Sequence, residues 1–196
     1  VKTPPTNYEE ETGNRYPQDK MRVDLRARTR DMFNDPSKMN VGGLFPHTIA
    51  YQAVNAKSTA TKEGKLAAWE KKIIDTKAKF DEVRARIGDE VSEIAAAMAA
   101  GNIVACADVS ASMTWVDKAP NRPLDIAMGL ACFISSVASD KFKDIAFSFT
   151  SQPYCFSFKG MNVIERMSAI MKHSGGSTNY EGLHDAMIKL CVENKV

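Results

Sequence analysis

The clearest periodic pattern in the chain lies between residues 62 and 87, where mostly apolar side chains recur at spacings of three and four. The repeated positions are Leu66, Trp69, Ile73, Thr76, Phe80, Val83 and Ile87. This spacing places them on one face of a helix, and charged residues occupy the other faces. We predict a helix over 62–87 and, after a possible N-cap at Asp89, a second helix to Ala100. The stripe is compatible with a coiled coil, and packing against the following domain is favoured.

From Gly101 onwards the pattern changes to short apolar runs that alternate with helical stretches. The predicted strands are 103–108, 144–150 and 154–158, and the predicted helices are 123–139, 161–172 and 181–193. The link between the second and third strands is too short for a crossover, so we expect these two strands to pair antiparallel. A sheet covered by helices, in an α/β domain, is the predicted fold class.

The chain before residue 62 carries only short patterns. Turn-forming residues between 3 and 16 predict an extended arm, 20–32 predicts a short charged helix, and Pro46 suits the first turn of another. We divide the chain into an irregular arm with short helices, a helical segment and the α/β domain: 1–61, 62–100 and 101–196.

Composition adds few constraints. The chain has 196 residues, 44% of them hydrophobic and 26% charged, with a net charge of +2. No apolar run approaches the ~20 residues that span a bilayer, and no apolar signal-peptide region stands near the first residue, so we expect no membrane partner. Five basic residues gather in the helix predicted at 20–32, where a solvated face is favoured over a phosphate-binding patch: Lys20, Arg22, Arg26, Arg28 and Arg30.

Cysteine usage favours a reducing, intracellular location. The four cysteines stand at 106, 132, 155 and 191, and none forms a Cys-x-x-Cys pair. Because Cys106 and Cys132 lie in apolar surroundings, we predict buried free thiols.

Candidate chemistry concentrates where the strand predicted at 103–108 ends. Asp108, Ser110 and Ser112 offer oxygen ligands at alternate positions, and a later glycine-rich loop at 174–179 offers the hydroxyl of Thr178. The carboxyl end of a central strand is where open α/β sheets build sites, and Mg²⁺ prefers oxygen ligands. The same pattern also suits a capping or turn role.

Other chemistries fit the sequence less well. The second aspartate of a phosphate-transferring aspartyl enzyme is replaced by Ser110, and Gly-x-Ser-x-Gly, Gly-x-x-x-x-Gly-Lys and Gly-x-Gly-x-x-Gly motifs are all absent. No general base or nucleophile arrangement is visible, so we do not expect an enzyme.

The segment 103–113, followed by Gly175-Gly176-Ser177-Thr178-Asn179, resembles the metal-ion-dependent adhesion site of the von Willebrand factor A (vWA) domain. The resemblance implies a Rossmann-like sheet flanked by helices and a bound Mg²⁺, or another divalent cation such as Mn²⁺ or Ca²⁺. It assigns the metal contacts to Asp108, Ser110, Ser112 and Thr178. It also implies a non-enzymatic module whose metal accepts a carboxylate from a protein partner.

A narrower resemblance joins Leu44-Phe45-Pro46-His47, the Trp69 helix and the glycine loop. Together they are similar to an uncharacterised vWA-containing family of plants, fungi and large DNA viruses, with a layout like that of Ro-type RNA-binding proteins. The Ro-like layout and the cluster from Arg22 to Arg30 favour an RNA-binding scaffold as one alternative function. The extended arm and a sheet that lacks strands favour, as another, a structural component of a large assembly such as a virus particle.

The vWA pattern also implies strands that this chain does not supply. Only three of six strands are predicted, so we expect the N-terminal half of the vWA domain, with its first strand at an apolar sheet edge. Such an edge tends to pair with another strand. We therefore expect the missing half to come from a continuation, a second chain or a neighbour in an assembly.

Overall fold

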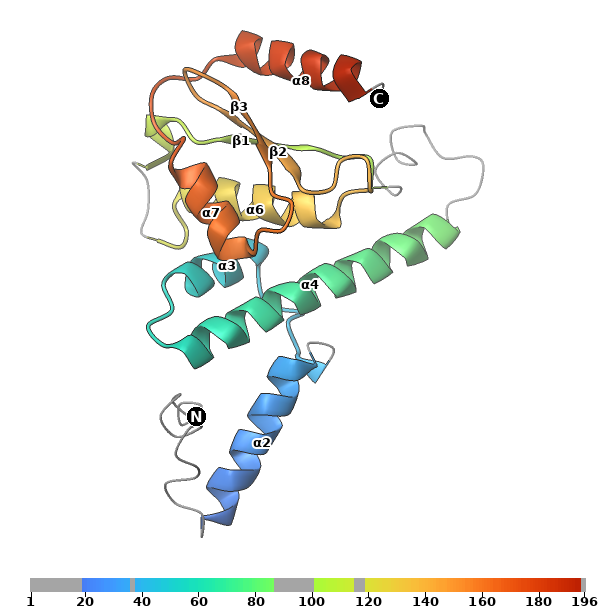
Figure 1. Ribbon diagram of the computed structural model, residues 1–196, viewed down its shortest axis with the longest axis vertical. Helices are drawn as coiled ribbons and strands as arrows, with labels where there is room; N and C mark the ends of the chain where they lie inside the picture. Colours follow the sequence, from blue (N-terminus) through green and yellow to red (C-terminus); the bar gives the residue numbers. More distant parts are fainter. Residues whose placement is uncertain (1–18, 36–37, 87–100, 115–118, 195–196) are drawn as a thin grey trace.

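The computed structural model describes residues 19–35, 38–86, 101–114 and 119–194, and these form a mixed α/β fold (Figure 1). The elements in order are α2 (Lys20–Asn34), α3 (Pro46–Val54), α4 (Thr59–Arg86), β1 (Ala105–Asp108), η2 (Ala111–Thr114), α6 (Pro123–Val137), β2 (Ile145–Phe149), β3 (Tyr154–Ser157), α7 (Val163–Met171) and α8 (Tyr180–Asn194). The predicted arm at 3–16 and the predicted helix ending at Ala100 lie outside the described residues.

The three strands form one mixed sheet in the order β1-β2-β3. β1 pairs parallel with β2, with Asp108 opposite Phe149. β2 pairs antiparallel with β3, which confirms the pairing predicted from the short link. Within the described residues β1 pairs with β2 alone, so β1 forms one edge of the sheet.

Helices cover both faces of the sheet (Figure 1). On one face, Phe147 and Phe149 pack against Leu183, with further side chains of α8 partly buried around them. On the other face, small residues such as Ala107 and Ala146 allow α6 to pack closely on the strands, and buried side chains of α7 join the same core. This alternation follows from the period of two along a strand.

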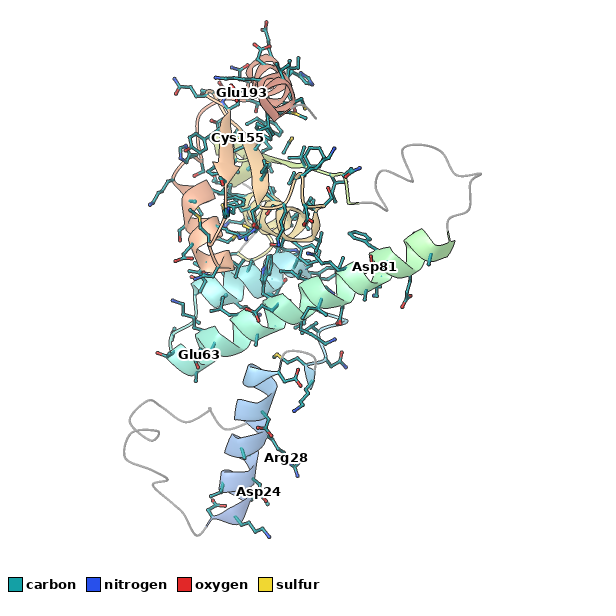
Figure 2. The ribbon with its side chains drawn as sticks, turned by 45° about the vertical axis from the view of Figure 1, so that its right-hand side comes forward. Asp24, Arg28, Glu63, Asp81, Cys155 and Glu193 are labelled. Atoms are coloured by element: carbon teal, nitrogen blue, oxygen red, sulfur yellow. The ribbon has the colours of Figure 1, made fainter. Side chains whose placement is uncertain are left out.

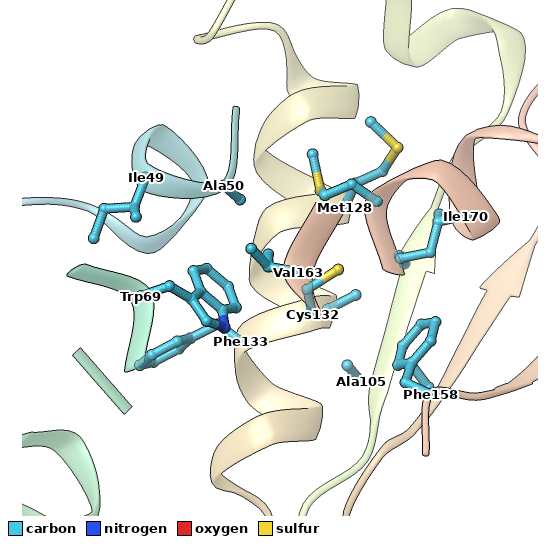
Figure 3. Close-up of a cluster of buried hydrophobic side chains, with 14 of the residues drawn as sticks. Ile49, Ala50, Trp69, Ala105, Met128, Cys132, Phe133, Phe158, Val163 and Ile170 are labelled. Atoms are coloured by element: carbon cyan, nitrogen blue, oxygen red, sulfur yellow. The ribbon is translucent and has the colours of Figure 1, made fainter. Parts of the chain in front are cut away.

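The larger core joins the sheet to the helices that precede it in the chain. The indole of Trp69 on α4 meets the ring of Phe133 on α6 edge to face, with 5.7 Å between the ring centroids (Figure 3). Ile49 and Ala50 of α3 are buried in the same core. The helix predicted at 62–87 therefore packs on the α/β domain, as expected.

The predicted apolar stripes are buried only in part. Val83 of α4 is 47% exposed, which corrects the expectation that the whole stripe from Leu66 to Ile87 packs on the following domain. The later turns of α4 extend past the helices that cover its first half (Figure 1). The apolar stripe is therefore longer than the surface of the domain on which it can pack. None of the described helices combines the length and the apolar character that crossing a bilayer requires.

Candidate metal centre

The candidate site begins at the last residue of β1. Asp108 ends the strand, and its Oδ1 accepts a hydrogen bond from the backbone N–H of Ser110 at 2.9 Å. Val109 and Ser110 are buried, and the chain then turns into the short 3-10 helix η2. The bond holds the carboxylate over the turn and leaves its second oxygen, Oδ2, without a hydrogen bond to a described residue.

Two hydroxyls lie side by side in this turn. The Oγ atoms of Ser110 and Ser112 are 3.1 Å apart. Two neighbouring ligands of an octahedral Mg²⁺, each about 2.1 Å from the ion, lie about 3.0 Å apart. The observed spacing therefore fits two adjacent positions of one coordination shell, and the oxygen chemistry of the donors fits a hard cation.

The glycine loop docks directly on this turn. The N–H of Gly175 donates to the carbonyl of Val109 at 2.7 Å, and the N–H of Ala111 donates to the carbonyl of Gly176 at 3.1 Å. Both glycines have positive φ, +111° and +70°, which side-chain-bearing residues rarely adopt. The two bonds lie on either side of Ser110, so the loop is fixed against the candidate ligands.

Thr178 stands two residues beyond the second of these bonds, on the same loop. Its side chain is exposed and makes no hydrogen bond to another described residue. The structure thus brings Asp108, Ser110 and Ser112 together in one turn and places the loop of Thr178 against them.

Residues just after β2 also hold the glycine loop in place. Ser151 Oγ accepts the N–H of Ser177 at 2.9 Å, and the carbonyl of Thr150 accepts the N–H of Asn179 at 3.1 Å. The Asn179 side chain in turn accepts the N–H of Gly182 at the start of α8, at 2.9 Å. Thr150 and Ser151 were not predicted to support the site, although parallel strands end at the same edge of a sheet, which singles out the residues just after β2.

The donor set is poor in charge. Among the described residues, no three His, Cys, Asp or Glu side chains gather where they could hold a metal ion. The candidate shell has one carboxylate, Asp108, and hydroxyls. Such a set leaves positions for water or for a ligand from outside, and Mg²⁺ usually keeps several waters.

The cysteines near the sheet offer no competing chemistry. Burial raises the pKa of the Cys106 thiol, and it raises the pKa of Cys132 to about 12. A thiol with a raised pKa stays protonated near neutral pH, and the thiolate is the form that attacks electrophiles or binds metals. All four cysteines are free, and Cys106 and Cys132 fit the predicted thiols only in part because Cys106 is half-buried.

These environments predict an order of thiol reactivity. Cys155 and Cys191 are exposed (Figure 2 labels Cys155 on β3), but partial burial of the Cys155 sulfur raises its pKa. In the native protein at pH 8, we expect a maleimide to label Cys191 first, Cys155 more slowly and Cys132 only after unfolding. Peptide mass spectrometry along a time course measures this order, and native labelling of Cys132 as fast as Cys191 contradicts it.

The basic cluster predicted in the first helix lies on α2, away from this centre (Figure 1). The side chains of Lys20 and Arg28 are exposed there (Figure 2 labels Arg28). RNA binding through this helix stays a prediction.

Comparison with curated proteins and with solved structures found no similar chain. A family model does match the α/β part of the chain, which contains the strand-end turn and the glycine loop. The match covers residues 102–196, and the family is described only as a domain of unknown function (DUF7788).

Proposed function

We propose that this chain is a metal-dependent protein-interaction module. A Mg²⁺ ion binds at the carboxyl edge of the sheet to Asp108, Ser110, Ser112 and Thr178, and an open coordination position accepts a carboxylate from a protein partner. The observation that carries the proposal is the pair of serine hydroxyls 3.1 Å apart, in the turn that Asp108 organises.

The strand order supports assigning the domain to the vWA fold. The resemblance implies that the first three strands lie in the order 3-2-1, and the short link between the second and third strands predicts that these two are antiparallel. The sheet has this arrangement, with α6 and α7 on one face and α8 on the other. The candidate ligands then lie at the end of the first strand, where that family binds its metal.

The charge of the donor set favours a carboxylate partner. One aspartate balances half of the charge of a divalent cation, so the bound ion keeps a net positive charge and an affinity for anions. Protein sites for Ca²⁺ weaken to a Kd of about 10⁻⁴ to 10⁻³ M as the charge of their ligands and the rigidity of the site decrease. We therefore expect weak binding by the isolated chain and tighter binding once a partner carboxylate enters the shell.

Binding is favoured over catalysis because the described histidines are occupied elsewhere or exposed. The ring of His173 stacks on Tyr154, with 4.1 Å between the ring centroids, and the ring of His47 stacks on Phe45. His184 is an exposed residue of α8. The proposed function needs no covalent step, only an open coordination position.

A partner strand at β1 belongs to the same proposal. The backbone groups of Ala105–Asp108 that face away from β2 pair with no described strand. A strand from the same polypeptide or from another chain can pair with this edge, and it can bring a further carboxylate to the metal.

Substitution of Asp108 by asparagine tests the metal site. Asparagine keeps the oxygen that accepts the Ser110 N–H but removes the charge, so the turn is preserved while the cation loses its one carboxylate. We expect Asp108→Asn to weaken Mg²⁺ and Mn²⁺ binding at least tenfold, about 1.4 kcal/mol, as measured by calorimetry.

The matched control is Asp185→Asn on α8, where the carboxylate is exposed. This control should bind both cations as the unsubstituted chain does. Equal binding by Asp108→Asn and the unsubstituted chain, or an equal loss in both variants, contradicts the proposed site.

A further inference from the structure

A second candidate site lies on the helical side of the protein. A cavity of about 350 Å³ opens between α3, α6 and α7. This volume is at the small end of the range of about 300 to 1,000 Å³ for ligand pockets and suits one ring-sized group. The cavity shares no residue with the candidate metal shell.

Methionines form the apolar part of the cavity. Met128 and Met167 line the cavity with buried side chains, and Met171 lines it with a side chain that is partly exposed to solvent. Thioether side chains adapt their shape, and their sulfur atoms make favourable contacts with aromatic rings. Three of the ten methionines of the chain meet here, which favours an aromatic occupant.

The polar side of the cavity is an ion pair between Arg122 and Asp125, whose opposite charges neutralise each other. Arg122 donates from Nε and Nη2 to the two carboxylate oxygens of Asp125, at 2.8 and 2.9 Å, and Asp125 is only 1% exposed. The Nη1 group of Arg122 makes no hydrogen bond to another described residue. The cavity therefore offers a donor without a net charge.

This charge balance selects the class of occupant. A ligand with its own carboxylate would lose its hydration at an ion pair that carries no net charge to compensate for that loss. An uncharged acceptor such as a peptide carbonyl can accept from Arg122 Nη1 with a much smaller desolvation cost. Asn55 and Ser168 also line the cavity and are exposed, and although each donates to a carbonyl of its own helix, the amide oxygen of Asn55 can still accept an N–H from the main chain of a bound peptide.

We propose that this cavity binds an aromatic side chain from an uncharged peptide segment of a protein partner. The ring packs on Met128 and Met167, and the main-chain carbonyl accepts a hydrogen bond from Arg122. Binding here needs no metal, so it is independent of the proposed function at Asp108.

The test follows the methionine methyl groups by NMR in the full chain labelled with [methyl-¹³C]methionine. The probe is acetyl-Gly-Phe-Gly-amide, and the matched control is acetyl-Gly-Ala-Gly-amide. We expect the phenylalanine peptide to shift the signals of Met128, Met167 and Met171 to saturation, with a Kd on the order of 1 mM. The alanine peptide should cause no shift at the same concentration.

Two substitutions at the rim place a large side chain over the opening: Val54→Trp on α3 and Ser168→Phe on α7. Both positions are exposed, so a folded variant is expected from at least one, and each should weaken peptide binding at least tenfold. Ile188→Trp on the exposed face of α8 is the control and should bind normally.

Chelation of divalent cations and the Asp108→Asn substitution should leave the shifts unchanged. Peptide binding that disappears with the metal overturns the assignment to this cavity. Equal shifts with the alanine peptide, full binding by a folded rim variant, or no shift at ~10 mM peptide, ten times the expected Kd, also overturns it.

Discussion

Replacing Gly129 with alanine is expected to lower the free energy of unfolding by about 2 kcal/mol, although alanine is the better helix former. Gly129 lies in the middle of α6, where the first turn of α3 crosses it. A Cβ atom at this position would lie 2.5 Å from the Cα and 2.6 Å from the Cβ of His47. Real Cβ atoms essentially never come closer than 3.0 Å to such neighbours, so one helix must move.

Two effects oppose each other in this substitution. Alanine gains about 1 kcal/mol over glycine in a helix interior. Overpacking a well-packed contact costs about 1 to 3 kcal/mol, and the upper end applies because the overlap is with backbone rather than with the end of a flexible side chain. Any shift of α3 also disturbs Ile49 and Ala50, which are fully buried. The overlap therefore outweighs the gain in helix propensity.

Urea unfolding followed by circular dichroism measures the effect, with Gly43→Ala as the control. A Cβ atom at Gly43 would meet nothing within 4 Å, and its φ is not in the left-handed region, so the change should stay within ~0.5 kcal/mol. A Gly129→Ala variant as stable as the unsubstituted chain would contradict the prediction, because the overlap would then cost no more than the ~1 kcal/mol that alanine gains in the helix.

The same contact shows which features local sequence patterns can predict. The helices and strands, the hairpin from β2 to β3 and the packing of the Trp69 helix on the α/β domain all follow from periodicity and link length. The close approach of Gly129 to His47 joins residues far apart in the chain, and neither residue interrupts the pattern around it. Such a contact becomes visible only when the two helices are placed in space.

The candidate site likewise has one part that the local sequence predicts and another part that only the fold reveals. Asp108, Ser110 and Ser112 lie in one local turn, so their alternate spacing was enough to predict that they lie together. The support from Ser151 comes from the end of another strand and meets the loop at Ser177 and Gly176. Ser151 carries no signal in its own stretch of sequence, and only the parallel pairing of β1 and β2 brings it to this edge.

The exposed part of the α4 stripe has a related cause. An amphipathic pattern predicts that a face can be buried, but it does not say how far the covering surface extends. Trp69 packs against Phe133 of α6, whereas Val83 lies further along α4 and stays exposed. The length of a neighbouring element is a property of the fold, so a stripe alone overestimates the core.

Replacing Arg166 with methionine is expected to lower the free energy of unfolding by about 3 kcal/mol. Arg166 is 8% exposed and joins three parts of the fold. Its Nη2 donates to Asp144 at 2.6 Å, its Nη1 donates to Ser135 and Ser136 at 3.3 and 3.2 Å, and its Nε donates to the carbonyl of Met161 at 2.9 Å. The guanidinium thus ties α7 to α6 and to the residue that precedes β2.

The size of the effect depends mainly on what Arg166 leaves behind. Removing one partner of a buried ion pair costs about 3 to 5 kcal/mol, because the other charge stays buried without compensation. The Asp144 side chain is 19% exposed, so water can relieve part of this cost and the lower end of the range applies. Methionine keeps an apolar stem that can still pack on the ring of Phe158, over which the guanidinium lies at 5.4 Å.

A double-mutant cycle with Asp144→Asn separates the ion pair from the packing. Asparagine keeps the left-handed backbone that this position requires, at φ 61°, and removes the charge. If the uncompensated carboxylate dominates, Arg166→Met should cost about 1 to 2 kcal/mol less in the Asp144→Asn background, as measured by urea unfolding. Equal costs in both backgrounds would mean that the hydrogen bonds to Ser135, Ser136 and Met161, rather than the ion pair, are what hold α7 in place.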